Sequence, residues 1–173
     1  KSPALLPPMP SSVTGVIHDL ERILLTPEQI HARVREMAVR LNGEFKGKVV
    51  TVVALMDGGL FFVADLLRAL EVPVRLFTLS ASSYHGGTST TGDVKVNWPA
   101  NLDLRDQDVL LLDDILDTGL TLDVISKRIL AEQPASLRTC VLLSKRRQRL
   151  RDVPLDDAGF EIADEFVVGY GMD

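Results

Sequence analysis

Three aspartates stand close together in the middle of the chain, where they could do chemistry. Asp113 and Asp114 follow the apolar residues 109–112, and Asp117 comes three residues later. Because like charges repel one another, such a cluster is expected to serve a bound group. Carboxylates can hold sugar hydroxyls or a hard cation such as Mg²⁺.

The residues after the third aspartate are suited to a phosphate. Thr118, Gly119 and Thr121 offer hydroxyl and backbone N–H groups, and the apolar spacing predicts a helix at residues 120–132. An anion is favoured at such a helix start, because the first N–H groups have no partner within the helix. Together with the aspartates, these residues predict a site for a ribose phosphate and its metal ion. The alternative is that the aspartates cap this helix and face water.

Alternating strands and helices are expected to position these groups. Continuous apolar and β-branched runs predict strands covered on both faces, and apolar residues at helical spacing predict helices. The predicted strands cover residues 49–55, 74–79, 108–112, 137–143 and 165–168. The predicted helices cover residues 27–43, after the capping residue Thr26, then 60–70 and 120–132. This order implies an α/β fold with a mostly parallel central sheet, whose ligands bind beyond the carboxyl ends of the strands.

Length and composition favour a single soluble domain. The chain has 173 residues, of which 46% are hydrophobic and 25% are charged, and these are ordinary values for a globular domain. We assign the domain to residues 13–173 and expect a flexible, proline-rich N-terminal arm at residues 1–12. No apolar run reaches the roughly 20 residues that a membrane span needs.

Charge and cysteine usage argue against several other classes of protein. The net charge of −5 is unfavourable for broad binding to nucleic acid. Cys140 is the only cysteine and lies in an apolar run, so we expect it to pack inside a protein of the reducing cytoplasm. The three histidines are far apart, so any metal should be bound by oxygen. The arginines of the basic run 145–151 are interpreted as a solvated loop.

Residues 109–121 closely resemble the signature for phosphoribosyl pyrophosphate (PRPP) of the type I phosphoribosyltransferases. Further segments, in the family's order, are similar to the hypoxanthine-guanine phosphoribosyltransferases. They are residues 58–66 (the pyrophosphate loop and its helix), 83–84 with 89–94 (the mobile catalytic loop), 144–146 (the purine-binding lysine) and 166–173 (the purine-stacking segment). The resemblance implies the type I fold, with a small hood and a mobile loop. It also implies transfer of the phosphoribosyl group from PRPP to hypoxanthine and/or guanine, giving IMP or GMP and pyrophosphate.

The resemblance also implies roles for individual residues. It assigns PRPP to Gly58, Asp113, Asp114, Asp117, Thr118, Gly119, Leu120 and Thr121. It assigns the purine to Lys145, Phe166, Val167 and Asp173, and Mg²⁺ to Asp113, Asp114 and Asp173. Asp117 would take part in proton transfer at purine N7. Tyr84 would cover the site when the loop at residues 80–93 closes. Taken alone, Lys145 would be interpreted as solvated and Phe166 as a core residue. Homodimers or homotetramers are usual for the family.

Three features depart from the family pattern. Asp57 stands where the family often has a lysine or arginine, and an unusual Met56–Asp57 peptide bond is expected there. The acidic pair is Asp113 and Asp114, where the family more often has Glu-Asp. The segment with the family's pyrophosphate-binding arginine would follow Asp173.

Other functions remain as alternatives. A non-catalytic regulator that senses PRPP or a nucleotide could use the same fold, and Asp57 favours it. No basic recognition helix supports a DNA-binding version of such a regulator. A phosphoacceptor receiver domain is disfavoured, because its acidic pair would lie on the first strand. Orotate or adenine as the base is disfavoured by Lys145 with Phe166 and Val167.

Overall fold

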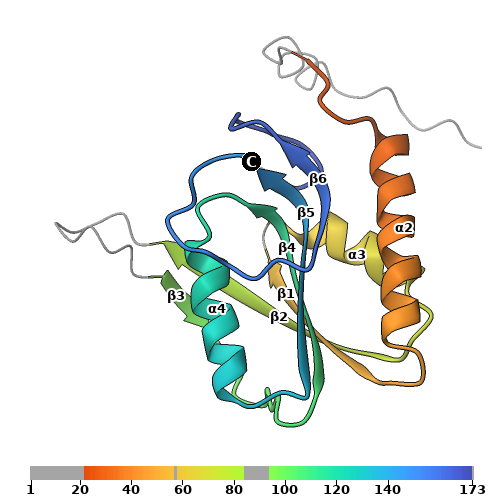
Figure 1. The fold of residues 1–173 in the computed structure, drawn as a ribbon, viewed down its shortest axis with the longest axis vertical. Coiled ribbons are helices and arrows are strands. Elements are labelled where there is room, and N and C mark those ends of the chain that lie inside the picture. The colour runs from red at the N-terminus through yellow and green to blue at the C-terminus, as the bar shows by residue number, and fades with distance from the viewer. Residues whose placement is uncertain (1–21, 57, 84–93, 173) are drawn as a thin grey trace, which may run out of the picture.

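The fold is built on one six-stranded sheet, seen in a computed structural model that describes residues 22–56, 58–83 and 94–172 (Figure 1). The strand order is β3-β2-β1-β4-β5-β6. The strands are β1 (Val50–Met56), β2 (Val74–Ser83), β3 (Val94–Asn97), β4 (Asp108–Leu116), β5 (Ser136–Lys145) and β6 (Asp157–Ile162). All neighbours pair in parallel except β3, which is antiparallel to β2. The carboxyl ends of the parallel strands therefore meet at one edge of the sheet.

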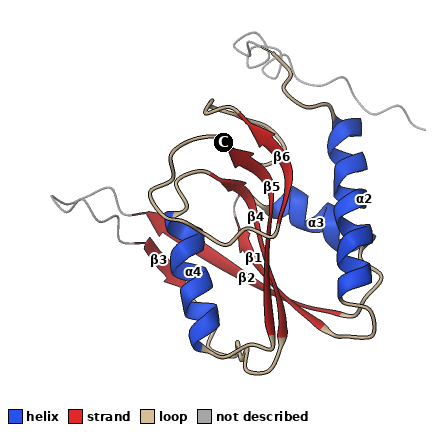
Figure 2. Ribbon diagram, in the orientation of Figure 1, coloured by secondary structure: helices blue, strands red, loops and turns tan. Residues whose placement is uncertain are grey.

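Helices cover both faces of this sheet (Figure 2). Helices α2 (Pro27–Glu44) and α3 (Leu60–Ala69) pack on one face, and α4 (Leu120–Ala131) packs on the other. Successive residues of a strand point to opposite faces, so Val52 lies in the core under α2 and α3, whereas Val53 lies in the core under α4. This explains the continuous apolar run of β1 and confirms the predicted mostly parallel α/β sheet.

The predicted start of α2 is confirmed in detail. The side chain of Thr26 accepts a hydrogen bond from the backbone of Gln29, and the side chain of Gln29 accepts one from the backbone of Thr26. Pro27 stands in the first turn, where it costs no hydrogen bond. Arg33 of the same helix donates to the backbone of Ala158 and Gly159, which fastens α2 to β6.

Two strand predictions need correction. The predicted strand at residues 165–168 is wrong, because that segment pairs with no strand of the sheet; the sheet ends with β6 instead. The sequence of β6 contains Asp157, Ala158 and Gly159, which have low strand propensity, so the run does not stand out. The short antiparallel β3 was also not predicted. Both β2 and β4 extend four residues beyond their predicted ends, to Ser83 and Leu116.

Several predictions fall outside the described residues. They concern the arm at residues 1–12, the Met56–Asp57 bond, Tyr84 with residues 85–93 of the catalytic loop, and Asp173. Among the residues that the structure does describe, no helix is both long enough and apolar enough to cross a membrane.

Candidate active site at the carboxyl edge of the sheet

The acidic pair lies within the last four residues of β4, at the carboxyl end of the strand as predicted, although the strand itself extends past the pair. Asp114 is 9% exposed and Asp113 is half-buried. The Asp113 carboxylate accepts a hydrogen bond of 2.9 Å from the backbone N–H of Asp114. Burial raises the pKa of Asp113 well above its ordinary value, and the adjacent charge of Asp114 raises it further. The pair therefore holds more negative charge than its surroundings favour, and a bound cation would relieve it.

The turn between β1 and α3 brings Gly58 against this acidic pair. A Cβ atom at Gly58 would lie only 1.9 Å from Asp114 Oδ2, and one at Gly59 would lie 2.4 Å from the carbonyl oxygen of Leu55. Gly59 therefore requires glycine, because its neighbour is backbone, and a side chain at Gly58 would displace the Asp114 carboxylate. The predicted pyrophosphate turn and the acidic pair form one continuous surface.

A second turn, residues 117–119, leads from β4 into α4. Gly119 has φ +83°, and a Cβ atom there would lie 2.6 Å from the carbonyl oxygen of Arg151. The carbonyl of Thr118 accepts hydrogen bonds from the backbone of Leu150 at 3.0 Å and Arg151 at 3.3 Å. The N-cap residue Gly119 has no side chain to cap the helix, and the N–H of Leu120 donates to the Thr118 hydroxyl at 3.4 Å. The positive end of α4 favours an anion at this turn. These contacts hold residues 118–121 in a shape suited to a phosphate.

Lys145 and Asp117 meet above this turn. Lys145 ends β5, its side chain is 11% exposed, and its Nζ atom donates to Asp117 Oδ2 at 3.1 Å. The guanidinium of Arg147 donates to Asp117 Oδ1 at 2.8 Å and lies 3.4 Å from Asp164. Asp117 is thus held between two cations, and the predicted lysine stands beside the predicted proton acceptor.

Arg147 and Asp164 were not predicted as members of this cluster. Arg147 belongs to the basic run that was interpreted as a solvated loop. It lies only two residues after Lys145, on the chain that leaves the same strand end. That position was the one signal in the sequence that could have found it.

The predicted purine-stacking segment presents an exposed aromatic ring. Phe166 is 84% exposed, whereas Val167 packs against the core under α2 and α3. Further along, the backbone of Gly171 lies against the pyrophosphate turn: a Cβ atom there would be 2.8 Å from the carbonyl oxygen of Gly58. Phe166 is therefore not a core residue, as it would have been interpreted if taken alone, and its ring is available to a flat ligand.

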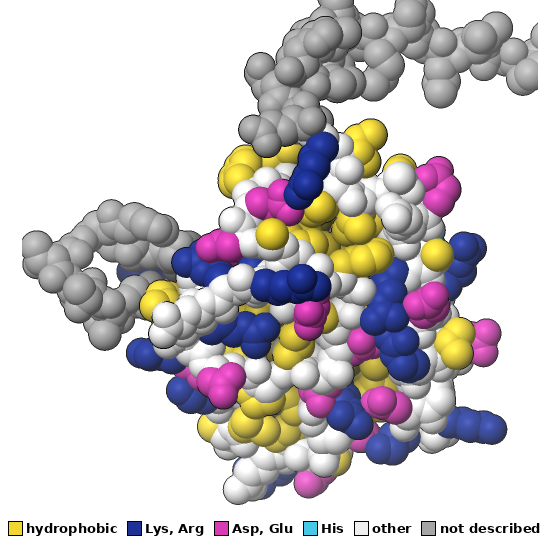
Figure 3. All heavy atoms as spheres, turned by 45° about the horizontal axis from the view of Figure 1, so that its top comes forward, with side chains coloured by type: hydrophobic (Ala, Val, Ile, Leu, Met, Phe, Trp, Pro, Cys, Tyr) yellow, Lys and Arg dark blue, Asp and Glu magenta, His cyan; other side chains and the backbone are white. Residues whose placement is uncertain are grey.

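The surface at this edge is mixed in character. Figure 3 turns the top of the molecule towards the viewer, and hydrophobic side chains are exposed there among basic and acidic ones. Within the described residues, no group of three or more histidine, cysteine or acidic side chains could hold a metal by itself. Two carboxylates do fit Mg²⁺, which proteins commonly hold with one or two carboxylates together with substrate phosphates.

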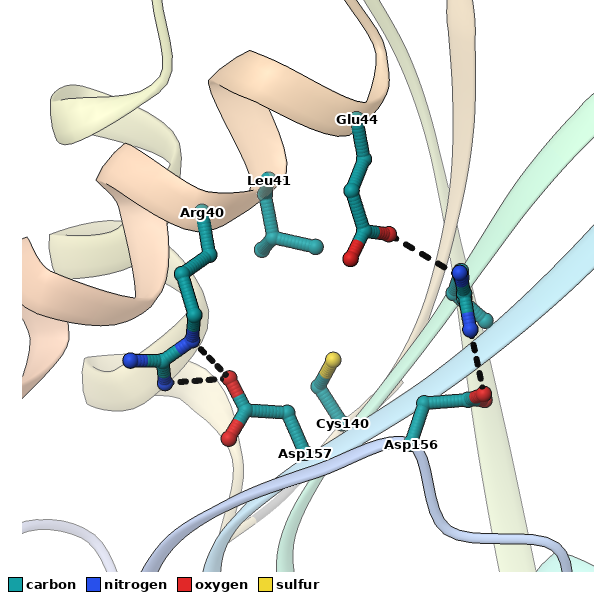
Figure 4. Close-up of a pocket in the computed structure, with 7 residues that line it drawn as sticks. Arg40, Leu41, Glu44, Cys140, Asp156 and Asp157 are labelled. Carbon is teal, nitrogen blue, oxygen red and sulfur yellow. Dashed lines mark hydrogen bonds and ion pairs between the residues drawn. The ribbon is translucent and has the colours of Figure 1, made fainter.

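A small cavity of about 110 Å³ lies elsewhere, between α2 and β5. Figure 4 shows the sulfur of Cys140 between ion pairs that join Arg40 to Asp157 and Glu44 to Arg138. Burial, followed by the nearby carboxylates, raises the pKa of Cys140 to about 12. The raised pKa disfavours the reactive thiolate in the folded protein, and the prediction that Cys140 packs in the interior is confirmed.

Comparison with known proteins places the chain among transferases. The family model for the phosphoribosyl transferase domain matches residues 23–173. The hypoxanthine phosphoribosyltransferase of Salmonella typhimurium is 40% identical over 158 residues, which cover 90% of this chain and 88% of that protein. The hypoxanthine-guanine phosphoribosyltransferase of Aquifex aeolicus is 39% identical over 153 residues, covering 88% of this chain and 86% of that protein.

Solved structures agree with the sequence relatives. A hypoxanthine-guanine phosphoribosyltransferase from Bacillus anthracis has a TM-score of 0.83 and 35% identity, covering 90% of this chain and 91% of that one. A hypoxanthine phosphoribosyltransferase from Staphylococcus aureus has a TM-score of 0.85 and 34% identity, covering 92% of this chain and 86% of that one. These matches confirm the predicted type I fold. The chain belongs to the hypoxanthine-guanine phosphoribosyltransferase family.

Proposed function

We propose that this protein transfers the 5-phosphoribosyl group of PRPP to a 6-oxopurine, hypoxanthine and/or guanine, giving IMP or GMP and pyrophosphate. The observation that carries the proposal is the distance of 3.1 Å between Lys145 Nζ and Asp117 Oδ2, beside the turn suited to a phosphate. A cation and a carboxylate at this spacing can contact two neighbouring atoms on one edge of a base. The 6-oxopurines offer such an edge, with O6 next to N7.

Recognition of the base follows from these side chains. Lys145 would donate to O6, which is an acceptor in a 6-oxopurine, and Asp117 would accept the proton at N7. The exposed ring of Phe166 would stack on the flat face of the purine, with the main chain of Val167 reading its far edge. Adenine carries a donor at position 6, so its amino group would face the ammonium of Lys145 unfavourably.

PRPP would lie between the two turns. The 5′-phosphate would bind the backbone and hydroxyls of residues 118–121, at the positive end of α4. The ribose hydroxyls would contact Asp113 and Asp114, and the pyrophosphate would contact the backbone N–H of Gly58. Mg²⁺ held by the two carboxylates would neutralise charge on the departing pyrophosphate. The roles of Tyr84 as a cover and of Asp173 as a further ligand stay predictions.

The reaction would proceed by loss of pyrophosphate from C1 of the ribose, through a state with oxocarbenium character. The chain would hold the purine and C1 in line, and Asp117 would take the N7 proton as the new bond forms. Such positioning contributes a large part of the rate enhancement in group transfer, because the reactants lose their translational and rotational freedom on binding, before the reaction.

Pyrophosphate release tests the proposal. The protein is incubated with PRPP, Mg²⁺ and hypoxanthine, guanine, xanthine or adenine in separate reactions. We expect release with hypoxanthine or guanine and none with adenine. If no pyrophosphate is released with any of the four bases although PRPP binds, the result would instead support a PRPP-sensing regulator. The relatives do not favour that alternative.

The assembly and the location of the protein are further parts of the proposal. We infer a homodimer or homotetramer in the cytoplasm, with no nucleic acid or membrane partner. Light scattering after size-exclusion chromatography measures the assembly. A monomer at micromolar concentration would contradict this part of the proposal without affecting the transferase reaction.

A further inference from the structure

Asp65 lies at the centre of a group of polar contacts on α3. Its carboxylate accepts a hydrogen bond of 2.5 Å from the hydroxyl of Tyr170, and it forms an ion pair with Arg68. His31 of α2 lies 3.5 Å away. Burial alone would raise the pKa of Asp65, but the hydrogen bonds from Tyr170 and Arg68 outweigh it and keep the pKa below its ordinary value. The carboxylate is therefore charged and directed at Tyr170.

The backbone of Tyr170 is in a conformation that a tyrosine does not favour by itself. Its φ is +54°, between Gly169 at +96° and Gly171 at +90°. The turn is closed by two backbone hydrogen bonds between Gly169 and Met172, of 2.8 and 3.1 Å. Two consecutive positive φ values are typical of turns built from glycine and asparagine, and a bulky residue there is uncommon. Contacts outside the turn must therefore favour this arrangement.

Such contacts come from α3 and from the turn that precedes it. The ring of Tyr170 packs on the ring of Phe61, with 5.9 Å between the centroids. The Tyr170 hydroxyl also lies 3.4 Å from the carbonyl oxygen of Phe61. The neighbouring Gly171 touches the backbone of Gly58 so closely that it has no room for a Cβ atom. The turn at residues 169–172 thus fits onto the start of α3.

We propose that Asp65 is a positioning residue for purine recognition: by accepting the hydroxyl of Tyr170, it holds residues 166–172 against α3 and the pyrophosphate turn. Phe166 is 84% exposed, so its own packing does little to fix its position, and the backbone of the segment must do so. The inference rests on the proposed function, because it assigns the purine to Phe166 and Val167. Asp65 and Tyr170 are 105 residues apart in the sequence, and the proposal assigns neither of them a direct contact with the base.

The test compares three single variants and one double variant. Tyr170→Phe removes the hydroxyl and keeps the ring, Asp65→Ala removes the acceptor, and Asp65→Asn keeps an acceptor oxygen. We expect Tyr170→Phe and Asp65→Ala to raise the KM for the purine about 10-fold, with kcat and the KM for PRPP changed less than about twofold. Asp65→Asn should restore most of the purine affinity. The double variant should be no worse than the poorer single variant, because both remove one hydrogen bond.

Arg68→Gln is the matched control. It removes the other partner of Asp65 from the same helix and leaves Tyr170 in place, so the KM for the purine should not change. An unchanged purine KM in Tyr170→Phe would overturn the inference. An equal rise of the purine KM in Arg68→Gln would also overturn it. So would a similar loss of affinity for the purine and for PRPP in the Tyr170 and Asp65 variants, if it accompanied a lower unfolding temperature.

Calorimetric binding of IMP or GMP, and thermal unfolding, accompany the kinetics. Nucleotide binding reports on the base segment even without turnover, so the inference can be judged separately from the proposed reaction. If the wild-type protein turns over no 6-oxopurine but Tyr170→Phe weakens IMP binding, the transferase proposal fails and the positioning role stands. If the wild-type protein is active and both proteins bind and use the purine equally, only the positioning role fails.

Discussion

The carboxylate of Asp114 lies against the backbone of Gly58, with room for hydrogen but not for a methyl group between them. Gly58 lies in the turn after β1 and Asp114 lies in β4, and the two are brought together because β1 and β4 are neighbours in the sheet. The acidic pair and the pyrophosphate turn therefore lie in direct contact and line the same part of the candidate site. A change in either is expected to disturb the other.

Gly58→Ala tests this close contact. The added methyl group would force the Asp114 carboxylate or the turn to move by about 1 Å or more, and misplacement on that scale can cost about 100-fold in rate. We expect kcat/KM for PRPP to fall by about that factor. Gly43→Ala is the control, because nothing lies within 4 Å of a Cβ atom there. Gly43 is in α2, so alanine should keep full activity and add up to about 1 kcal/mol to the free energy of unfolding.

The raised pKa of Asp113 predicts a pH-dependent effect on stability. A carboxyl whose pKa is higher in the folded state destabilises that state as the pH rises through its ordinary pKa towards the raised value. Asp113→Asn removes this charge, so the ligand-free variant should unfold at a higher temperature than the wild type at pH 7. The difference should disappear below about pH 4, where the carboxyl is protonated in both states.

Thermal unfolding across this pH range, without Mg²⁺ or PRPP, measures the effect. Asp103→Asn is a suitable control, since Asp103 is exposed and precedes β4 at the opposite end of the strand. The same Asp113→Asn protein should bind PRPP with Mg²⁺ more weakly. A variant that is less stable than the wild type at pH 7 would contradict the prediction.

Arg147 is expected to support Asp117 in a way that its neighbour Arg146 does not. Arg147→Gln removes the hydrogen bond of 2.8 Å to Asp117 Oδ1, and we expect kcat/KM for the purine to fall about 10-fold. Arg146 pairs at the surface with Glu161, at 3.3 Å, and such exposed pairs contribute little. Arg146→Gln should therefore stay within about twofold of the wild type, and equal effects of the two substitutions would argue against a special role for Arg147.

Removal of divalent metal should abolish the transferase reaction. The described residues offer two adjacent carboxylates and no larger group of ligands, so we expect Mg²⁺ to bind weakly alone and more tightly with PRPP. EDTA should stop pyrophosphate release, and excess Mg²⁺ should restore it. Calorimetric titration with Mg²⁺, with and without PRPP, checks the order of binding. Full activity in EDTA would remove the metal from the mechanism.

Elements whose own residues carry a clear pattern were predicted from the sequence. The continuous apolar residues of β1 and the capping box at Thr26 of α2 are formed by residues close together in the sequence, and both were found. The edge strand β6 was missed because Asp157 and Gly159 have low strand propensity. Pairing with β5 and hydrogen bonds from α2 hold this strand in place. An edge strand of this kind depends on tertiary contacts more than on its own composition.

Ion pairs and hydrogen bonds between distant segments had no comparable signal. The family resemblance assigned Asp117 and Lys145 separate roles towards the purine, but neither the contact between them nor the contact of Asp117 with Arg147 was predicted. Asp65 and Tyr170 each belong to a recognised segment, but nothing in either segment indicates that they meet. Such pairs depend on which helices, turns and strand ends lie side by side in the fold, and that arrangement exists only after the chain folds.

The buried Cys140 gives this chain a built-in probe of its own motion. The thiol is the only one in the sequence and lies beneath α2, behind the ion pairs of Arg40 and Arg138. A thiol reagent can react there only when α2 separates from the sheet, so the labelling rate counts those openings. Measured with and without nucleotide, the rate would reveal whether ligand binding at the strand ends slows the separation of α2 from the sheet.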